Sequence, residues 1–335
     1  MHTYYANIYT LFCLMVDEFD SGDDGSAMKH KNYDLIGDIH GHHDKLTALL
    51  KKLGYLPNGE SFHHPEGRKV IFLGDYIDRG PKIRQVLRTV RAMVDAGDAL
   101  AIMGNHEYNA VLYHTPDDKG GWLRPHRLDR DSGLRVTLDQ FAGLDDEWAD
   151  WLEWMKSLPM FLDMGGLRAV HACWDAQSMQ QLKGKCLTDD EFLHASAKRG
   201  TRLCGAVDHV LKGPEMDMPD GCLYHDKEGI ARRSVRVRWW DIPEAARVSH
   251  LAMPTPFDEP GEAEVGQLRQ MPNYGPEEPP VFFGHYWLPA DQEKAPLRHN
   301  IACLDFSAAR EGPMVAYRWN GERELTPLNF VTATA

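Results

Sequence analysis

The chain of 335 residues has few cysteines and no long hydrophobic run. Its six cysteines form no C-x-x-C pair, which in a chain of this length indicates reduced thiols rather than a disulfide framework. No apolar run approaches the length of a membrane-spanning helix. The apolar patch at residues 8–16 lacks the basic start of a secretory signal. We therefore expect a cytoplasmic protein without a membrane partner.

Basic residues are scarce relative to acidic ones. The chain has 37 Lys and Arg against 50 Asp and Glu, which gives a formal net charge of −13. Sequence-independent binding to nucleic acid needs a basic surface, so we do not expect nucleic acid as a partner. A small anionic substrate is compatible with this charge, because bound metal ions can dominate the field within a site.

Short apolar runs alternate with segments of helical spacing in the first third of the chain. The runs at residues 33–37, 70–73 and 99–103 predict buried strands, and each is followed by a predicted helix. This alternation implies crossover connections and a parallel sheet, so the expected fold class is α/β. In such sheets, ligands bind at the carboxyl ends of the strands.

The rest of the chain divides into an extension, a domain and an insertion. Residues 1–27 precede the first predicted strand and are expected to be a disordered extension. Residues 28–335 are expected to form a single domain. Within it, the insertion at residues 174–280 is expected to shape the substrate pocket. Further strands are predicted at residues 167–170, 281–283, 301–305 and 314–319.

Five short motifs hold the residues that can carry chemistry, and most of them directly follow a predicted strand. One such motif alone is a weak signal, because similar triplets occur by chance in turns. Together the five supply ligands for two metal ions, with a histidine and an aspartate left for proton transfer. The motifs are Gly37-Asp38-Ile39-His40-Gly41, Gly74-Asp75-Tyr76-Ile77-Asp78-Arg79-Gly80, Gly104-Asn105-His106-Glu107, Val170-His171-Ala172 and Gly284-His285-Tyr286.

The spacing of these motifs predicts the metal ligands. Asp38 and His40 are two residues apart at a strand end, so their side chains point the same way and can share one ion. Asp75 follows the next strand, and its two carboxylate oxygens can bridge two cations about 3.5–4 Å apart. Mixed oxygen and nitrogen donors suit manganese, iron, zinc or nickel, and we expect two manganese ions first. The ligands predicted for the second ion are Asp75, Asn105, His171 and His285.

The motifs also provide a nucleophile and an acid. Two cations that share a water lower its pKa toward about 7, so we expect a metal-bridging hydroxide to attack a phosphomonoester. His106 directly follows the predicted ligand Asn105 and is the best candidate for the general acid. Asp78 would keep His106 protonated and oriented, and the planar guanidinium of Arg79 would bind phosphoryl oxygens.

An alternating segment of the insertion offers a further cation for the substrate. In the strand predicted at residues 234–240, Arg236 and Arg238 share one face. One interpretation is that this face binds the substrate phosphate, for which we favour Arg238. The other is a solvated edge strand that its charges protect from pairing with other chains.

The first three motifs, GDxHG, GDxxDRG and GNHE, resemble those of the calcineurin-like metallophosphoesterase superfamily, in particular its phosphoprotein-phosphatase (PPP) branch. That branch includes bacterial Ser/Thr protein phosphatases and symmetrical dinucleoside tetraphosphatases. The resemblance covers residues from about 33 to 320 and implies a four-layer α/β/β/α sandwich of two mixed sheets. It also implies the metal roles, the acid pair of His106 with Asp78, and the phosphate-binding role of Arg79 given above.

Two differences from the motifs of other superfamily members indicate which members this chain resembles most. The last motif, Gly284-His285-Tyr286, is followed by Trp287 and lacks the second histidine of the G-H-x-H form found in many phosphodiesterases. The fourth motif, His171-Ala172-Cys173, resembles the bacterial and tetraphosphatase versions rather than the His-Gly-Gly of eukaryotic protein phosphatases.

The expected function is therefore a dimetal-dependent phosphatase that acts on phosphomonoesters, with phosphoproteins as the leading substrate class. Hydrolysis of dinucleoside polyphosphates such as diadenosine tetraphosphate is the main alternative. A degenerate scaffold that only binds partners is the non-enzyme alternative, and the complete ligand set argues against it. Removal of phosphate from nucleic-acid ends is disfavoured by the acidic balance of the chain.

Overall fold

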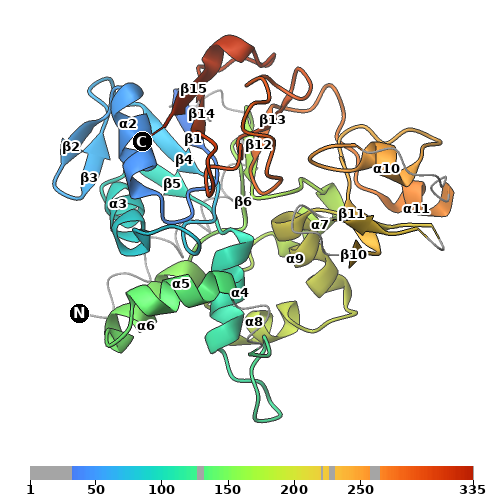
Figure 1. The fold of residues 1–335 in the computed structure, drawn as a ribbon, viewed down its shortest axis with the longest axis horizontal. Helices are drawn as coiled ribbons and strands as arrows, with labels where there is room; N and C mark the ends of the chain where they lie inside the picture. Colours follow the sequence, from blue (N-terminus) through green and yellow to red (C-terminus); the bar gives the residue numbers. More distant parts are fainter. Residues whose placement is uncertain (1–31, 127–131, 220–221, 226–230, 257–264, 335) are drawn as a thin grey trace.

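The computed structural model describes residues 32–126, 132–219, 222–225, 231–256 and 265–334, and Figure 1 shows their arrangement. The extension expected at residues 1–27 lies outside the described residues. Within the described ranges, none of the helices combines the length and the apolar character needed to cross a bilayer.

A five-stranded mixed sheet leads into the first three motifs. Its strand order is β15-β14-β1-β4-β5, in which β1, β4 and β5 are parallel and β14 and β15 are antiparallel to their neighbours. All four residues of β1 are buried, as expected for a central strand of a sheet that is covered on both faces. The strands are β1 (Tyr33–Ile36), β4 (Lys69–Phe72), β5 (Ala99–Ala101), β14 (Met314–Trp319) and β15 (Phe330–Ala333).

A second mixed sheet leads into the last two motifs. Its order is β13-β12-β7-β6, with β12 parallel to both β7 and β13 and with β6 antiparallel to β7. The two sheets meet in the core, where the rings of Phe282 and Tyr317 have centroids 5.1 Å apart. The strands are β6 (Phe161–Asp163), β7 (Arg168–Val170), β12 (Val281–Phe283) and β13 (Ile301–Cys303).

Helices cover the sheets and complete the layers. Helices α2 (His43–Lys52) and α3 (Ile83–Asp95) pack against the first sheet, and α3 turns one apolar face towards it. Figure 1 places the other long helices below and to the right of the sheets. The four-layer α/β/β/α sandwich of two mixed sheets is therefore confirmed. The other long helices are α4 (Asn105–His114), α5 (Ser132–Gln140), α6 (Asp145–Lys156), α7 (Ala176–Leu182), α8 (Asp190–Ser196) and α9 (Arg202–Lys212).

The later part of the insertion forms a small lobe at the right of Figure 1. This insertion lobe, the described residues between 215 and 270, has an apolar cluster of its own beside the main core. Its elements are β8 (Glu215–Asp217), β9 (Tyr224–His225), β10 (Ala231–Arg232), β11 (Ser234–Arg236), α10 (Val248–Leu251) and α11 (Val265–Gln270). Its buried apolar residues are Met216, Met218, Val235, Val237, Val248, Leu251, Ala252 and Leu268.

Three features differ from the sequence expectation. Strands β6 and β15 were not predicted, because both are short, partly exposed edge strands without the continuous apolar run of a central strand. A hairpin of β2 (Leu56–Asn58) and β3 (Ser61–His63) follows α2. The strand predicted at residues 234–240 is shorter than expected, and β11 spans only Ser234–Arg236.

A buried ion cluster ties the first sheet to the segments around it. Asp34 in β1 is fully buried, and its carboxylate accepts hydrogen bonds from Nε and Nη2 of Arg68 at 3.1 Å each. Arg318 Nε donates to the same carboxylate at 3.0 Å, and so does the Tyr55 hydroxyl at 3.0 Å. Two guanidinium groups therefore depend on one buried carboxylate for their negative partner.

We expect Asp34→Asn to lower the free energy of unfolding by about 3–5 kcal/mol, because it leaves the buried charge of Arg68 without a counter-charge. Asp44→Asn is the matched control. Asp44 pairs with Lys82 at an exposed position, so its loss should cost less than about 1 kcal/mol. Chemical denaturation followed by circular dichroism measures both values. Equal, small losses would mean that the Asp34 cluster does not stabilise the sheet.

Candidate metal centre

The five motifs converge because each one begins at or just after the carboxyl end of a strand, namely β1, β4, β5, β7 or β12. The turns there are strained. A residue with a side chain in the left-handed region costs on the order of 1–3 kcal/mol, and such residues gather at functional sites. Those in these turns are His40 (φ 44°), Asp75 (φ 54°), Asp78 (φ 70°), Arg79 (φ 67°), His285 (φ 70°) and Trp287 (φ 55°).

Two glycines in these turns are required by close approach of other groups. A Cβ atom on Gly104 would lie 2.3 Å from Asp75 Oδ1, and one on Gly284 would lie 2.0 Å from Asp38 Oδ1. In both cases a carboxylate oxygen of a predicted metal ligand is among the nearest atoms, and for Gly104 the backbone nitrogen of Asp75 is equally close. A side chain at either position would therefore displace a ligand.

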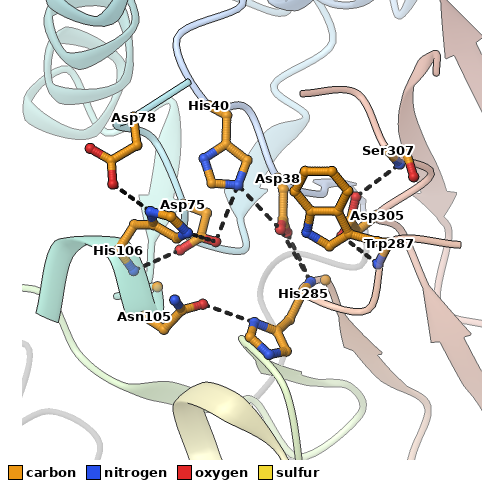
Figure 2. Close-up of polar contacts among 12 residues, drawn as sticks. Asp38, His40, Asp75, Asp78, Asn105, His106, His285, Trp287, Asp305 and Ser307 are labelled. Carbon is orange, nitrogen blue, oxygen red and sulfur yellow. Dashed lines mark hydrogen bonds and ion pairs between the residues drawn. The ribbon is translucent and has the colours of Figure 1, made fainter. Parts of the chain in front are cut away.

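Asp75 lies at the centre of the predicted ligands. Its Oδ2 is 3.4 Å from His40 Nε2 (Figure 2), and its Oδ1 is 3.4 Å from His171 Nε2. The carboxylate belongs to two groups of closely spaced ligand atoms, one with His40 and His106 and the other with His171 and His285. One carboxylate thus faces two places where a cation could sit.

Backbone carbonyls fix the orientation of two of these imidazoles. His40 donates from Nδ1 to the carbonyl of Ile77, and His171 donates from Nδ1 to the carbonyl of Leu73, each at 2.8 Å. The second nitrogen of each ring, Nε2, is therefore unprotonated in the neutral form and faces Asp75. This is how second contacts usually orient histidine ligands of metals.

Asn105 joins the second group. Its Oδ1 lies 3.0 Å from His171 Nε2 and 2.8 Å from His285 Nδ1, and Figure 2 shows the latter contact. With Asp75 Oδ1, this gives two oxygens and two imidazole nitrogens that face one another in a buried place. The structure therefore brings together all four residues predicted for the second ion.

Asp38 lies beside the first group rather than within it. Its Oδ2 is 3.9 Å from His40 Nε2, and both its oxygens accept the backbone N–H of His285, at 3.1 and 3.2 Å. Burial, and then the negative charges of Asp305 and Asp75, raise the pKa of Asp38 well above its usual range. A cation in this place would favour the ionised form of Asp38.

The surroundings of the His40 and His171 imidazoles indicate whether the site can hold a metal ion. Burial lowers the pKa of His40 to about 3, and its buried Nε2 has no hydrogen-bond partner among the described residues. Burial also opposes the charged form of His171, but the adjacent Asp75 outweighs it and raises the pKa of His171 to about 10. The negative charge of Asp75 therefore favours positive charge at the His171 side, which a metal ion would supply in place of the proton. The donor set and the field both fit divalent cations.

His106 and Asp78 form a close pair at the rim of the cluster. His106 donates from Nδ1 to Asp78 Oδ2 at 2.5 Å, and the Thr137 hydroxyl donates to Asp78 Oδ1 at 2.5 Å. Burial alone would lower the pKa of His106, but the charge of Asp75 and the hydrogen bond to Asp78 raise it above its ordinary value. His106 Nε2 lies 3.9 Å from Asp75 Oδ2, so the pair holds a proton next to the predicted ligands.

A cavity of about 380 Å³ opens onto this cluster. Besides predicted ligands, it is lined by Tyr286 and Trp287, by Glu215 as the acidic residue, and by arginines that come from several turns and strands. Positive charge therefore surrounds the space in which a substrate would bind. The arginines of the lining are Arg79, Arg232, Arg236 and Arg310.

The two arginines of the alternating segment are placed differently. Arg236 lines the cavity, and its charge, second to burial, lowers the pKa of His285 well below its usual range. Arg238 is not among the lining residues, and its Nη2 lies 3.8 Å from Asp241 Oδ2. The preference for Arg238 gains no support from this placement. The alternation of buried and half-buried residues continues to Arg238, but β11 ends at Arg236, and Val237 forms a bridge with Ala252.

Glu107 is a site residue whose role the sequence motifs do not reveal. Its buried carboxylate accepts the backbone N–H groups of Asp75, Tyr76, Ile77 and Gly104, at 2.9, 2.8, 3.2 and 3.0 Å. Burial, and then the charge of Asp75, raise the pKa of Glu107 to about 7. Its place at the third position of helix α4 predicts the bond to Gly104, but nothing local predicts the other three.

Comparison with known proteins gives a family match. The sequence profile of the calcineurin-like phosphoesterases matches residues 32–229. The bis(5′-nucleosyl)-tetraphosphatase PrpE (asymmetrical) of Halalkalibacterium halodurans is 46% identical over 115 residues, which is 34% of this chain and 43% of the relative. Its Bacillus subtilis counterpart is 48% identical over 75 residues, 22% of this chain and 30% of the relative. The chain thus spans less than half the length of these curated relatives.

Two solved structures are similar over most of the chain. A protein serine/threonine phosphatase from Saccharomyces cerevisiae covers 98% of this chain and 89% of its own, with 12% identity and a TM-score of 0.44. A cold-active protein-tyrosine phosphatase from a Shewanella species covers 88% and 80%, with 17% identity and a TM-score of 0.44. At these TM-scores the likeness supports no conclusion about the activity of this chain.

Proposed function

Because the chain belongs to the calcineurin-like phosphoesterase family, we propose that it is a phosphoester hydrolase that uses two divalent metal ions. The observation that carries this proposal is the position of Asp75. Its two oxygens each lie 3.4 Å from an imidazole of a different ligand group. A carboxylate placed in this way can hold two cations side by side.

The proposed ligands divide between the two ions at Asp75. Asp38, His40 and Asp75 would hold the first ion. When bound, the two cations supply Lewis-acid chemistry, which neutralises charge on the phosphoryl group and makes water more acidic. Manganese is the expected metal, with iron, zinc or nickel as alternatives, because the donors mix oxygen and nitrogen. The second ion would be held by Asp75, Asn105, His171 and His285.

The residues around the cluster bind the phosphoryl group and deliver a proton. Arg79 and Arg236 line the cavity and would bind phosphoryl oxygens through their planar guanidinium groups. The oxygen of a water molecule, which gives up one proton to solvent, forms the new bond to phosphorus as the bond to the leaving oxygen breaks. His106 gives its proton to that leaving oxygen, and Asp78 keeps His106 protonated and oriented until then.

A nucleotide polyphosphate, such as a dinucleoside tetraphosphate, is the substrate class that we propose. The named activity of the curated relatives supports this choice. So does the cavity, because a chain of phosphates complements four arginines better than a single phosphate on a peptide does. Phosphoproteins, the leading class from sequence alone, therefore become the class against which this proposal is tested.

Two further assignments complete the proposal. Residues 28–335 would act as one domain, in which the insertion at residues 174–280 supplies one wall of the substrate cavity. The activity would take place in the cytoplasm. The cysteines that the structure describes form no disulfide bond, which is in keeping with a reducing compartment.

We expect Asp75→Asn to reduce the bound manganese from two ions per chain to fewer than one, because the amide lacks the charge shared between both ions. The rate of p-nitrophenyl phosphate hydrolysis should fall by more than about 100-fold. This exceeds the usual loss when a residue that only contacts a metal ligand is changed. Asp118→Asn, at an exposed loop position, is the control and should change neither value. Mass spectrometry of the metal content after gel filtration measures the first quantity. Two ions and full activity in Asp75→Asn would rule out a shared carboxylate.

His106→Asn should affect substrates according to their leaving group. Phenyl phosphate needs a proton on its leaving oxygen, so we expect its kcat to fall by roughly 100-fold or more. p-Nitrophenolate leaves without a proton, and its kcat should fall far less. Asp78→Asn should show the same pattern with a smaller loss, because it weakens the proton donor without removing it. Equal losses on both substrates would show that His106 does not protonate the leaving group.

The substrate class is tested with manganese-loaded protein, a phosphoserine peptide and diadenosine tetraphosphate at equal concentration. We expect faster conversion of the dinucleotide, because its charge matches the arginine-lined cavity. Chromatography separates the products. Cleavage next to one end of the phosphate chain gives AMP with ATP, and cleavage in the middle gives two ADP. Preferred turnover of the peptide would return the assignment to a protein phosphatase.

A further inference from the structure

Trp287 and Arg310 form a wall of the cavity that the catalytic steps above do not use. The guanidinium carbon of Arg310 lies 5.2 Å from the centroid of the Trp287 ring, and that of Arg79 lies 4.2 Å from a ring centroid of the same side chain. All three residues line the cavity. Both guanidinium groups therefore contact the same side chain, and an anion held by Arg79 has the charge of Arg310 in the same cavity.

The segment that carries Arg310 is fixed by contacts outside regular secondary structure. Lys45 Nζ donates to the carbonyls of Ala308, Arg310 and Gly312, at 2.8, 3.0 and 2.9 Å. A Cβ atom on Gly312 would lie 1.9 Å from the carbonyl oxygen of Phe306, so the chain folds back tightly on itself there. One ammonium group thus holds three carbonyls of this turn together.

The same segment is fastened to Trp287. Asp305 accepts the backbone N–H of Trp287 at 2.7 Å and that of Ser307 at 3.0 Å, as Figure 2 shows. The Ser307 hydroxyl donates to the carbonyl of Leu288 at 2.9 Å. The turn before Arg310 and the aromatic ring beneath its guanidinium are therefore placed before a substrate arrives, which lowers the entropic cost of binding.

The positively charged groups assigned to catalysis can bind one phosphoryl group without the help of Arg310. That group would face Arg79, Arg236 and the two metal ions, and Arg310 adds positive charge to the same cavity. A lone phosphate presents no second charged group for Arg310 to bind. A chain of linked phosphates does, and the planar fork of arginine suits its oxygens.

We propose that Arg310, stacked on Trp287, binds the phosphate next to the one that is cleaved. It thereby makes the site selective for substrates with at least two linked phosphates. This inference rests on the proposed hydrolysis at Asp75 for the position of the cleaved phosphate. Lys45 acts as a positioning residue, because it fixes the turn that carries Arg310.

The variant Arg310→Gln tests this proposal by calorimetry, with manganese in excess over ligand so that chelation does not strip the site. The probes are methylenebisphosphonate, which carries two linked phosphorus groups that water does not cleave, and methylphosphonate, which carries one. The wild type should bind the bisphosphonate more tightly. Arg310→Gln should weaken bisphosphonate binding by roughly 10- to 100-fold, the effect of a charged hydrogen bond. Binding of methylphosphonate should change by less than about twofold.

Arg323→Gln is the matched control, since Arg323 is exposed, donates to the carbonyl of Glu277 and does not line the cavity. It should change neither affinity. Equal weakening of both phosphonates in Arg310→Gln would place Arg310 on the cleaved phosphate and overturn the proposal. Unchanged bisphosphonate binding, or a wild type without preference for the bisphosphonate, would also overturn it. The proposed hydrolase activity is tested separately. A wild type that binds the bisphosphonate through Arg310 but cleaves no phosphoester would contradict the proposed function and leave the Arg310 subsite supported.

Discussion

The buried carboxylate of Glu107 makes the contact on which the rest of the site depends. It accepts the backbone N–H groups of residues 75, 76 and 77 and that of Gly104. In this turn Asp75 has a φ of 54°, which is unfavourable for a residue with a side chain. The four backbone hydrogen bonds to the Glu107 carboxyl group offset that cost. Without them, the turn after β4 would relax and Asp75 would no longer face both ligand groups.

This contact also explains how the ends of two strands are coupled. Glu107 lies in the first turn of α4, directly after β5, and the residues that it binds follow β4. Asn105 and His106 belong to the same helical turn. One turn of helix therefore positions a proposed metal ligand, the proposed proton donor and the anchor of the shared carboxylate. A small change in the start of α4 would disturb all three together.

Much of this arrangement could be predicted, because the motifs directly follow buried strands and the strand ends of a layered sheet gather in one place. The roles of residues that act through irregular turns could not be predicted from the sequence. Helix position accounts for one of the four bonds of Glu107, and the others depend on how the turn after β4 folds. Regular alternation placed Arg236 and Arg238 on one face and could not decide between them, whereas in the structure Arg236, and not Arg238, is among the residues that line the cavity. Arg310 belongs to no motif, and its place is set by the carbonyl contacts of Lys45.

The insertion lobe has an apolar cluster separate from the core that supports the metal ligands. Arg236 extends into the cavity from the lobe, whereas Arg79 and Trp287 belong to turns at the ends of the main sheets. The two sides of the cavity therefore rest largely on different cores, although Trp239 and Trp240 of the lobe pack in the main one. Substitutions that repack the lobe can reshape which molecules fit while the strained turns around Asp75 stay unchanged. Substrate choice and bond-breaking chemistry are thus free to evolve at different rates in this protein.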